Sequence, residues 1–212
     1  MTNVRSAEEL AAPLGSVDLG RLVFVRGAAH LTIRVDASME DLYRARFEGK
    51  VPDVRVDGGT VTVKYRPSLH RTSGEITLSG RVPWAIKASM GMSDVAADLQ
   101  DLELTDLEIS GGVSRLLVRL PRPKATVPVR IGAGASNLEL VRPAGVPVRV
   151  RIGGGASKLA IDTFRVGAGG GRPTGEARTT SWSGAATTSR SAPEPARSPS
   201  EPDSIARGAS GS

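Results

Sequence analysis

Apolar and polar residues alternate in short runs along residues 20–166, and glycine or proline separates these runs. A period of two is typical of β-strands that bury one face. The most regular part is a repeat of 21 or 22 residues, in which a serine follows a glycine-containing turn. The serines that mark the four copies are Ser93, Ser114, Ser136 and Ser157.

Aligning the copies on these serines produces four apolar columns, two on each side of the glycine turn. The columns after the turn are Val95, Leu116, Leu138, Leu159 and Ala97, Val118, Leu140, Ile161. The columns before the turn are Ile86, Leu107, Val129, Val150 and Ala88, Ile109, Ile131, Ile152. The positions between them are mostly polar, and one such column is Asp94, Arg115, Asn137 and Lys158. Each copy therefore predicts two short strands with one buried face.

A single copy of this unit cannot bury its apolar face, whereas stacked copies turn each column into a continuous ladder. We therefore predict an all-β fold, a solenoid-like stack of short strands, with a β-sandwich of the same strands as the alternative. We expect the glycines of the turns, such as Gly132 and Gly134, to supply the positive φ angles of a tight reversal.

Residues before the regular repeat resemble degenerate copies of it. Residues 27–33 echo residues 155–161, and residues 54–65 predict a hairpin around Asp57, Gly58 and Gly59. Residues 38–47 fit a short helix or a strand equally well. We predict an N-terminal lead-in at 1–19, a β-repeat domain at 20–166, and a disordered tail rich in glycine, serine, proline and arginine at 167–212. The tail is either a native extension or the product of a shifted reading frame.

The composition narrows the classes of protein and of site. Hydrophobic residues make up 39% of the chain and aromatics only 3%, so we expect a core of valine, leucine, isoleucine and alanine. The absence of cysteine excludes disulfides and thiolate-bound metals. No apolar run is long enough for a membrane-spanning helix, and the N-terminus lacks the pattern of a secretory signal. The expected location is cytoplasmic, or peripheral to a membrane.

The repeated Gly-Ala-Ser-x-Leu strands, together with residues 41–49 and 54–59, resemble the bacterial "putative adhesin" or "toastrack" β-repeat families. These families are related to the C-terminal domain of LiaF-type cell-envelope stress proteins, and the N-terminal part resembles an actinobacterial group among them. The resemblance covers roughly residues 20–166. It implies an all-β repeat fold and a non-enzymatic role in interaction or in sensing near the cell envelope, and it supplies no site residues.

The sequence offers little for catalysis. His30 and His70 have no neighbours in the sequence that would complete a triad or a metal site, so we expect both to be solvated or lightly packed. The acidic residues between positions 94 and 108 lack the regular offset of a calcium-binding repeat. The glycine turns precede strands and carry no phosphate-loop lysine. We therefore predict no catalytic residue, no cofactor, no metal and no small-molecule substrate.

One basic surface is the candidate for binding. Arg130, Arg149 and Arg151 fall on corresponding strands of adjacent repeats, where stacking would align them as a stripe. Ion pairing with neighbouring glutamates, such as Glu108, is the structural alternative. With a net charge of +6, the chain could contact an anionic membrane surface. We predict an interaction or scaffold module with a protein partner; self-assembly through the ends of the stack is the alternative, and nucleic-acid binding is disfavoured because aromatic platforms are scarce.

Overall fold

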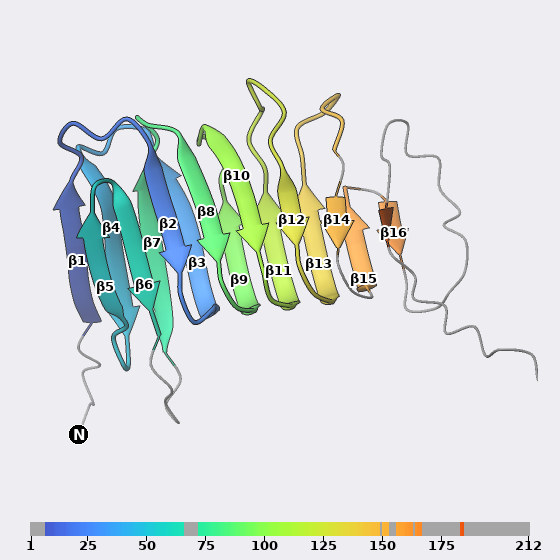
Figure 1. Ribbon diagram of the computed structural model, residues 1–212, viewed down its shortest axis with the longest axis horizontal. Coiled ribbons are helices and arrows are strands. Elements are labelled where there is room, and N and C mark those ends of the chain that lie inside the picture. Colours follow the sequence, from blue (N-terminus) through green and yellow to red (C-terminus); the bar gives the residue numbers. More distant parts are fainter. Residues whose placement is uncertain are drawn as a thin grey trace, which may run out of the picture.

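The structure is a computed structural model that describes residues 7–65, 72–148, 150–152, 156–162, 164–166 and 183–184. Within these ranges the regular elements are β-strands, arranged as two sheets that lie one in front of the other (Figure 1). One continuous hydrophobic cluster fills the space between the sheets. The described residues contain no helix with the length and apolar character needed to cross a membrane. The predicted all-β fold is confirmed.

The front sheet of Figure 1 contains eight strands in the order β17-β14-β12-β10-β8-β2-β6-β5. Their bounds are β2 (Gly20–Phe24), β5 (Asp53–Asp57), β6 (Thr60–Lys64), β8 (Trp84–Ala88), β10 (Leu104–Ile109), β12 (Val129–Ile131), β14 (Val150–Ile152) and β17 (Ser183–Gly184).

The rear sheet contains nine strands in the order β1-β4-β7-β3-β9-β11-β13-β15-β16. Their bounds are β1 (Ala7–Pro13), β3 (Ala28–Asp36), β4 (Asp41–Glu48), β7 (Ser73–Ser79), β9 (Met92–Asp98), β11 (Val113–Arg119), β13 (Ala135–Val141), β15 (Ala156–Ile161) and β16 (Phe164–Val166).

Each 21- or 22-residue repeat forms one coil of a solenoid. The chain follows a strand of the eight-stranded sheet, turns at the glycines, and returns along a strand of the nine-stranded sheet, as in β8–β9 and β10–β11 (Figure 1). Corresponding strands pair in parallel: Leu107 lies between Ile86 and Val129, and Leu116 pairs with Val95 on one side and Leu138 on the other. The apolar columns read from the sequence are therefore ladders through the core, as predicted, for the members whose side chains the structure describes.

The N-terminal end of the stack is built from antiparallel strands. Strand β4 pairs antiparallel with both β1 and β7, which settles residues 38–47 in favour of a strand. The segment predicted as an N-terminal lead-in, residues 1–19, contains strand β1, and Ala7–Pro13 pairs along its whole length with β4. Leu10 and Ala12 also pack against the core, and this burial explains why the segment belongs to the sheet.

Two local predictions for the N-terminal half are confirmed. Strands β5 and β6 form the expected hairpin, with Val54 opposite Val63 and Val56 opposite Val61. Residues 27–33 form part of a true repeat strand, since Ala28 pairs with Met92 of β9. The spatial order was not predicted: β6 lies between β5 and β2 in one sheet and β7 lies between β4 and β3 in the other, while β8–β9 continue the stack on the other side of β2–β3.

The core is aliphatic along the regular repeats but aromatic towards the N-terminal end. The largest fully buried side chains are Trp84, Phe24 and Phe47, so the expectation of a purely aliphatic core is wrong there. Gly20 leaves room for the indole, since a Cβ at that position would lie 2.5 Å from the Trp84 ring. The indole Nε1 donates a hydrogen bond to the Ser79 carbonyl at 2.9 Å. Few aromatic residues suffice because they are concentrated in one region.

The described glycines in the turns between β8 and β13 serve close approach of the backbone, whereas Gly27, in the turn between β2 and β3, has a φ of +79°. Gly132 and Gly134 are not among the residues with positive φ, which corrects the expectation for them. A Cβ on Gly91 would lie 2.6 Å from the Gly112 carbonyl oxygen, and one on Gly132 would lie 2.5 Å from the Ser110 carbonyl oxygen. Neighbouring turns therefore stack too closely for side chains. The prediction of a disordered tail at 167–212 lies outside the described residues except for Ser183–Gly184, which pair with β14.

Candidate functional site

Five non-glycine residues with left-handed backbone form a row across the nine-stranded sheet. They all lie third in their strands and share φ angles of 51° to 53°. We call them the left-handed row: His30, Asp94, Arg115, Asn137 and Lys158. Asparagine, aspartate and histidine adopt this conformation more readily than other side chains, whereas arginine and lysine pay roughly 1 kcal/mol or more for it.

The left-handed residue is a bulge that resets the inward–outward alternation. In β9, Met92 and Val95 are both buried, with Ser93 and Asp94 between them on the outer side. The ladder pairs Ser93 with Ser114 and Val95 with Leu116, and it leaves the bulge residues out. A bulged residue bends the strand and aims its side chain outward. The sequence signal for it is an apolar spacing of three, between Met92 and Val95, in place of two.

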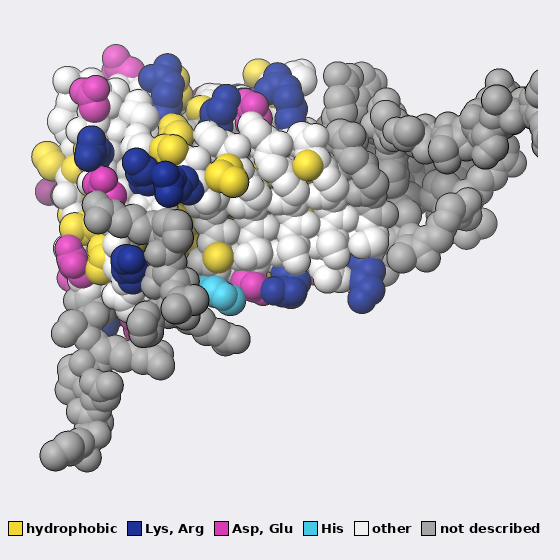
Figure 2. Space-filling view, turned by 60° about the horizontal axis from the view of Figure 1, so that its bottom comes forward, with side chains coloured by type: hydrophobic (Ala, Val, Ile, Leu, Met, Phe, Trp, Pro, Cys, Tyr) yellow, Lys and Arg dark blue, Asp and Glu magenta, His cyan; other side chains and the backbone are white. Residues whose placement is uncertain are grey.

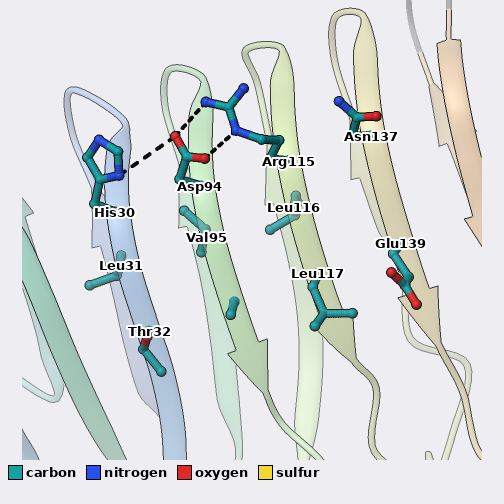
Figure 3. Close-up of a pocket in the computed structure, with 11 residues that line it drawn as sticks. His30, Leu31, Thr32, Asp94, Val95, Arg115, Leu116, Leu117, Asn137 and Glu139 are labelled. Atoms are coloured by element: carbon teal, nitrogen blue, oxygen red, sulfur yellow. Dashed lines mark hydrogen bonds and ion pairs between the residues drawn. The ribbon is translucent and has the colours of Figure 1, made fainter.

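An ion pair and a contact of His30 connect the first members of the row. The Arg115 guanidinium binds the Asp94 carboxylate through two nitrogens, with Nη2 2.7 Å from Oδ2, and Nδ1 of His30 lies 3.7 Å from Oδ2 of Asp94 (Figure 3). The hydrogen bond to Asp94 raises the pKa of the Arg115 guanidinium. In Figure 2, cyan, magenta and dark blue side chains follow one another along the lower edge of the stack, in agreement with this row.

Below the row lies a shallow groove of about 410 Å³, which runs across β3, β9, β11 and β13 (Figure 3). Its floor is an outward column in which Thr32 pairs with Ala96, Ala96 with Leu117, and Leu117 with Glu139. The small side chain of Ala96 between larger neighbours creates the hollow. The volume lies within the range of roughly 300–1,000 Å³ usual for ligand pockets.

The far end of the groove carries polar groups without partners. Within the described part of the chain, the side chains of Asn137 and Glu139 take part in no hydrogen bond or ion pair, and Glu139 is exposed. Asp94, by contrast, is neutralised by Arg115. The lining thus combines one uncompensated carboxylate, one free amide, and apolar side chains at Ala96 and Leu117. Such an arrangement can hydrogen-bond and attract a cation, but it supplies no activated nucleophile.

This groove was not predicted from the sequence, although the repeat alignment already brings His30 and Asp94 together. His30 was expected to have no partner, because Asp94 is 64 residues away in the chain. Residues 27–33 were recognised as a degenerate repeat, however, and aligning them with the other copies places His30 in the Asp94 column. His30 is outward and partly exposed, as expected. The other histidine, His70, lies outside the described residues.

The predicted arginine stripe lies on the other sheet, and the structure describes only part of it. Arg130 pairs in register with Arg151, and the Arg130 side chain binds Asp106 at 3.0 Å. Arg149 lies outside the described residues, and so does the Arg151 side chain. On the same face, Lys87 donates a hydrogen bond to Glu108 at 3.1 Å. This bond, with help from Ser110 and the charge of Arg130, keeps the pKa of Glu108 below its usual value.

Acidic residues between positions 94 and 108 form separate ion pairs with cationic side chains of neighbouring coils. Asp98 lies 3.7 Å from Arg119, and Glu103 binds Lys124. No three potential metal ligands come together among the residues that the structure describes. The spacing of these pairs by one repeat follows from the parallel register.

Comparison with known proteins agrees with the coiled architecture. The model of the family described as "N-terminal domain of toast_rack, DUF2154" matches residues 27–141. The chain belongs to the toast-rack family. The match covers the inserted β6–β7 pair and the regular coils up to β13, and so includes every strand that lines the groove.

A solved structure shares the toast-rack fold. It is the crystal structure of a protein from Clostridium sporogenes ATCC 15579 described as a "putative cell adhesion protein", with a TM-score of 0.54 and 16% sequence identity. The alignment covers 74% of this toast-rack chain and 97% of the other. At this identity the likeness concerns the fold alone. No curated protein matches the chain.

Proposed function

We propose that this toast-rack chain is a non-catalytic interaction module that binds a protein partner on the outer face of the nine-stranded sheet. The observation that carries the proposal is the groove below the left-handed row, which combines a hollow floor at Ala96 with the unpartnered side chains of Asn137 and Glu139. The residues that line it supply hydrogen-bonding and charged groups, which suits recognition.

The regular register supports a binding role. Neighbouring strands of a sheet lie about 4.8 Å apart, and the parallel pairing of β3, β9, β11 and β13 fixes the outward side chains at that spacing. A surface that is already ordered loses little conformational entropy on association. The description of the structural neighbour as a "putative cell adhesion protein" agrees with such a role. A place near the cell envelope, in the cytoplasm or at the membrane surface, is part of the same proposal and rests on the family resemblance.

Self-assembly through the ends of the stack is the second candidate. The N-terminal edges work against it, because exposed charges and a proline discourage pairing between edge strands. Strand β1 exposes Glu8, Glu9 and Pro13, and strand β5 exposes Arg55 and Asp57. The arginine stripe is a third binding candidate, but the pairing of Arg130 with Asp106 leaves that side chain less available for a ligand.

The proposal is tested by capturing partners from the native host with the full chain and with two surface variants. Leu117→Arg places a long charged side chain in the groove, and Val23→Arg is the matched control on the outer face of the opposite sheet. We expect a partner captured by the native chain and by Val23→Arg to be lost with Leu117→Arg.

Other outcomes would overturn the proposal in different ways. Loss with Val23→Arg, or with Arg130, Arg149 and Arg151 all changed to glutamate, but not with Leu117→Arg, would move the binding face to the eight-stranded sheet. Sedimentation that shows concentration-dependent filaments and no captured partner would favour self-assembly.

A further inference from the structure

The charges that line the groove do not cancel. Asp94 is held by both nitrogens of the Arg115 fork, so these two side chains contribute no net charge. Glu139 has no cationic partner among the described residues, and its carboxylate stands at the end of the groove (Figure 3). The groove therefore attracts a positive group at one defined position.

The surface next to that carboxylate is apolar. Leu117 pairs in register with Glu139, and Ala96 pairs with Leu117, so a methyl group, an isobutyl group and a carboxylate follow one another across three strands. Lysine and arginine carry a charged head on an aliphatic stem, and the stem packs on apolar surface while the head reaches a polar group. In this column Ala96 and Leu117 offer an apolar surface to the stem, and Glu139 offers a carboxylate to the charged head.

The remaining lining groups suit a peptide backbone. Asn137 offers both a donor and an acceptor, Thr32 offers a hydroxyl, and His30 offers a ring nitrogen. A peptide presents alternating N–H and C=O groups to such a set, whereas a polyamine presents only donors. The distance from β3 to β13 is three strand spacings, about 14 Å, and four or five residues of extended chain cover it.

We propose that the groove binds an extended segment of a partner protein through a lysine or arginine side chain, whose stem lies over Ala96 and Leu117 and whose charge pairs with Glu139. This proposal rests on the proposed function and names the chemistry of the partner. It assigns the specificity of the face to Glu139, since this carboxylate is the uncompensated charge among the described lining residues.

The test is a titration of the full, ¹⁵N-labelled chain, followed by NMR, with an acetylated and amidated pentapeptide of glycine that has a central lysine. We expect the largest shifts at backbone amides of β9, β11 and β13. Glu139→Gln should weaken binding about fivefold, as expected for loss of an exposed ion pair. Glu40→Gln, which makes the same change at another exposed glutamate, should leave the affinity unchanged.

A second variant tests the hollow without altering charge. Ala96→Leu fills the floor of the groove at an exposed strand position, where the larger side chain is tolerated. It should abolish the shifts caused by the lysine peptide while the rest of the spectrum stays that of the folded chain.

Three results would overturn the inference. One is equal binding of a pentapeptide with central glutamine, and another is unchanged affinity in Glu139→Gln. A third is larger chemical-shift changes at the same amides with spermidine than with the lysine peptide, which would identify a polyamine as the ligand in place of a peptide. If Leu117→Arg still loses a captured partner while the lysine peptide fails to bind, the partner chemistry is wrong and the interaction module stands. If neither binding is observed, both proposals fail.

Discussion

Single residues in this stack are specified by two different constraints, backbone conformation and burial. The left-handed row needs a positive φ angle, which explains Asp94, Asn137 and His30 better than any contact with a neighbour does. Arg115 accepts the same conformation and gains the ion pair with Asp94. Because the row faces solvent, its side chains are free to differ between coils, and this variation gives the groove its polar edge.

Tyr65 shows how burial acts on one ionisable residue. Its ring packs edge-on against Phe47 with centroids 6.5 Å apart, and its buried hydroxyl has no hydrogen-bond partner among the described residues. Burial raises the pKa of Tyr65 to about 12, and it also raises the pKa of Tyr43. The folded chain thus holds the Tyr65 proton more tightly than the unfolded chain does.

The stability contributed by Tyr65 is therefore complete below pH 10 and is lost as the pH rises from 10 towards 12. Tyr65→Phe keeps the ring and removes the hydroxyl, so it should leave stability at pH 7 unchanged or raise it by up to about 1 kcal/mol. The substitution should also reduce the loss of stability between pH 7 and pH 11. Urea unfolding at pH 7 and at pH 11 checks both effects. A clear loss of stability at pH 7 would mean that the hydroxyl has a hydrogen-bond partner.

At the scale of elements, the tight turns set a limit on what can be substituted. Gly91→Ala would place its Cβ 2.6 Å from the Gly112 carbonyl oxygen, whereas Gly112→Ala would place its Cβ 3.1 Å from the Gly134 carbonyl oxygen. We expect Gly91→Ala to destabilise the chain by about 1–3 kcal/mol, and Gly112→Ala by less. Thermal unfolding of the two variants gives the comparison. Equal effects would show that the turns can move apart.

The same elements show how much of the fold could be predicted from the sequence. The regular coils were predicted because identical spacing recurs, so Leu116 and Leu138 could be aligned before their partners were seen. The bulge was missed because the apolar columns after the turn were begun at Val95 and left out Met92, which is also buried and stands three residues before it. The placement of β6–β7 before β2–β3 depends on which edges meet in space, and no local pattern encodes it.

The candidate site was less accessible to sequence reasoning than the fold. A groove arises when a small side chain stands between larger ones on neighbouring strands. The role of Ala96 can therefore be recognised only when Thr32 and Leu117 are known to flank it. The arginine stripe was predicted from the corresponding positions of Arg130, Arg149 and Arg151 in adjacent repeats. The structure pairs Arg130 with Asp106, and the sequence could not rank this carboxylate, which lies 24 residues away, above Glu108.

On the scale of the whole molecule, a stack of equivalent coils should tolerate the removal of one coil. Deleting residues 114–135 joins Val113 to Ser136, and the register already pairs Val113 with Ala135. We expect a folded chain with a smaller urea m-value and a lower free energy of unfolding, since one interface between coils is lost.

Circular dichroism and urea unfolding measure this outcome. A deletion of residues 114–124, about half a coil, is the control, because it would bring a strand of one sheet into the place of a strand of the other. That variant should fail to fold. If both deletions unfold the chain, the coils are not equivalent units.

The direction of the backbone hydrogen bonds has a mechanical consequence. They run between neighbouring strands and therefore along the long axis of the stack (Figure 1). A tension applied between the two ends loads the terminal pair of strands first and peels the coils off in sequence. Each coil that detaches releases 21 or 22 residues, about 70 Å of extended chain. Under load we expect the stack to lengthen stepwise while its remaining coils keep their shape.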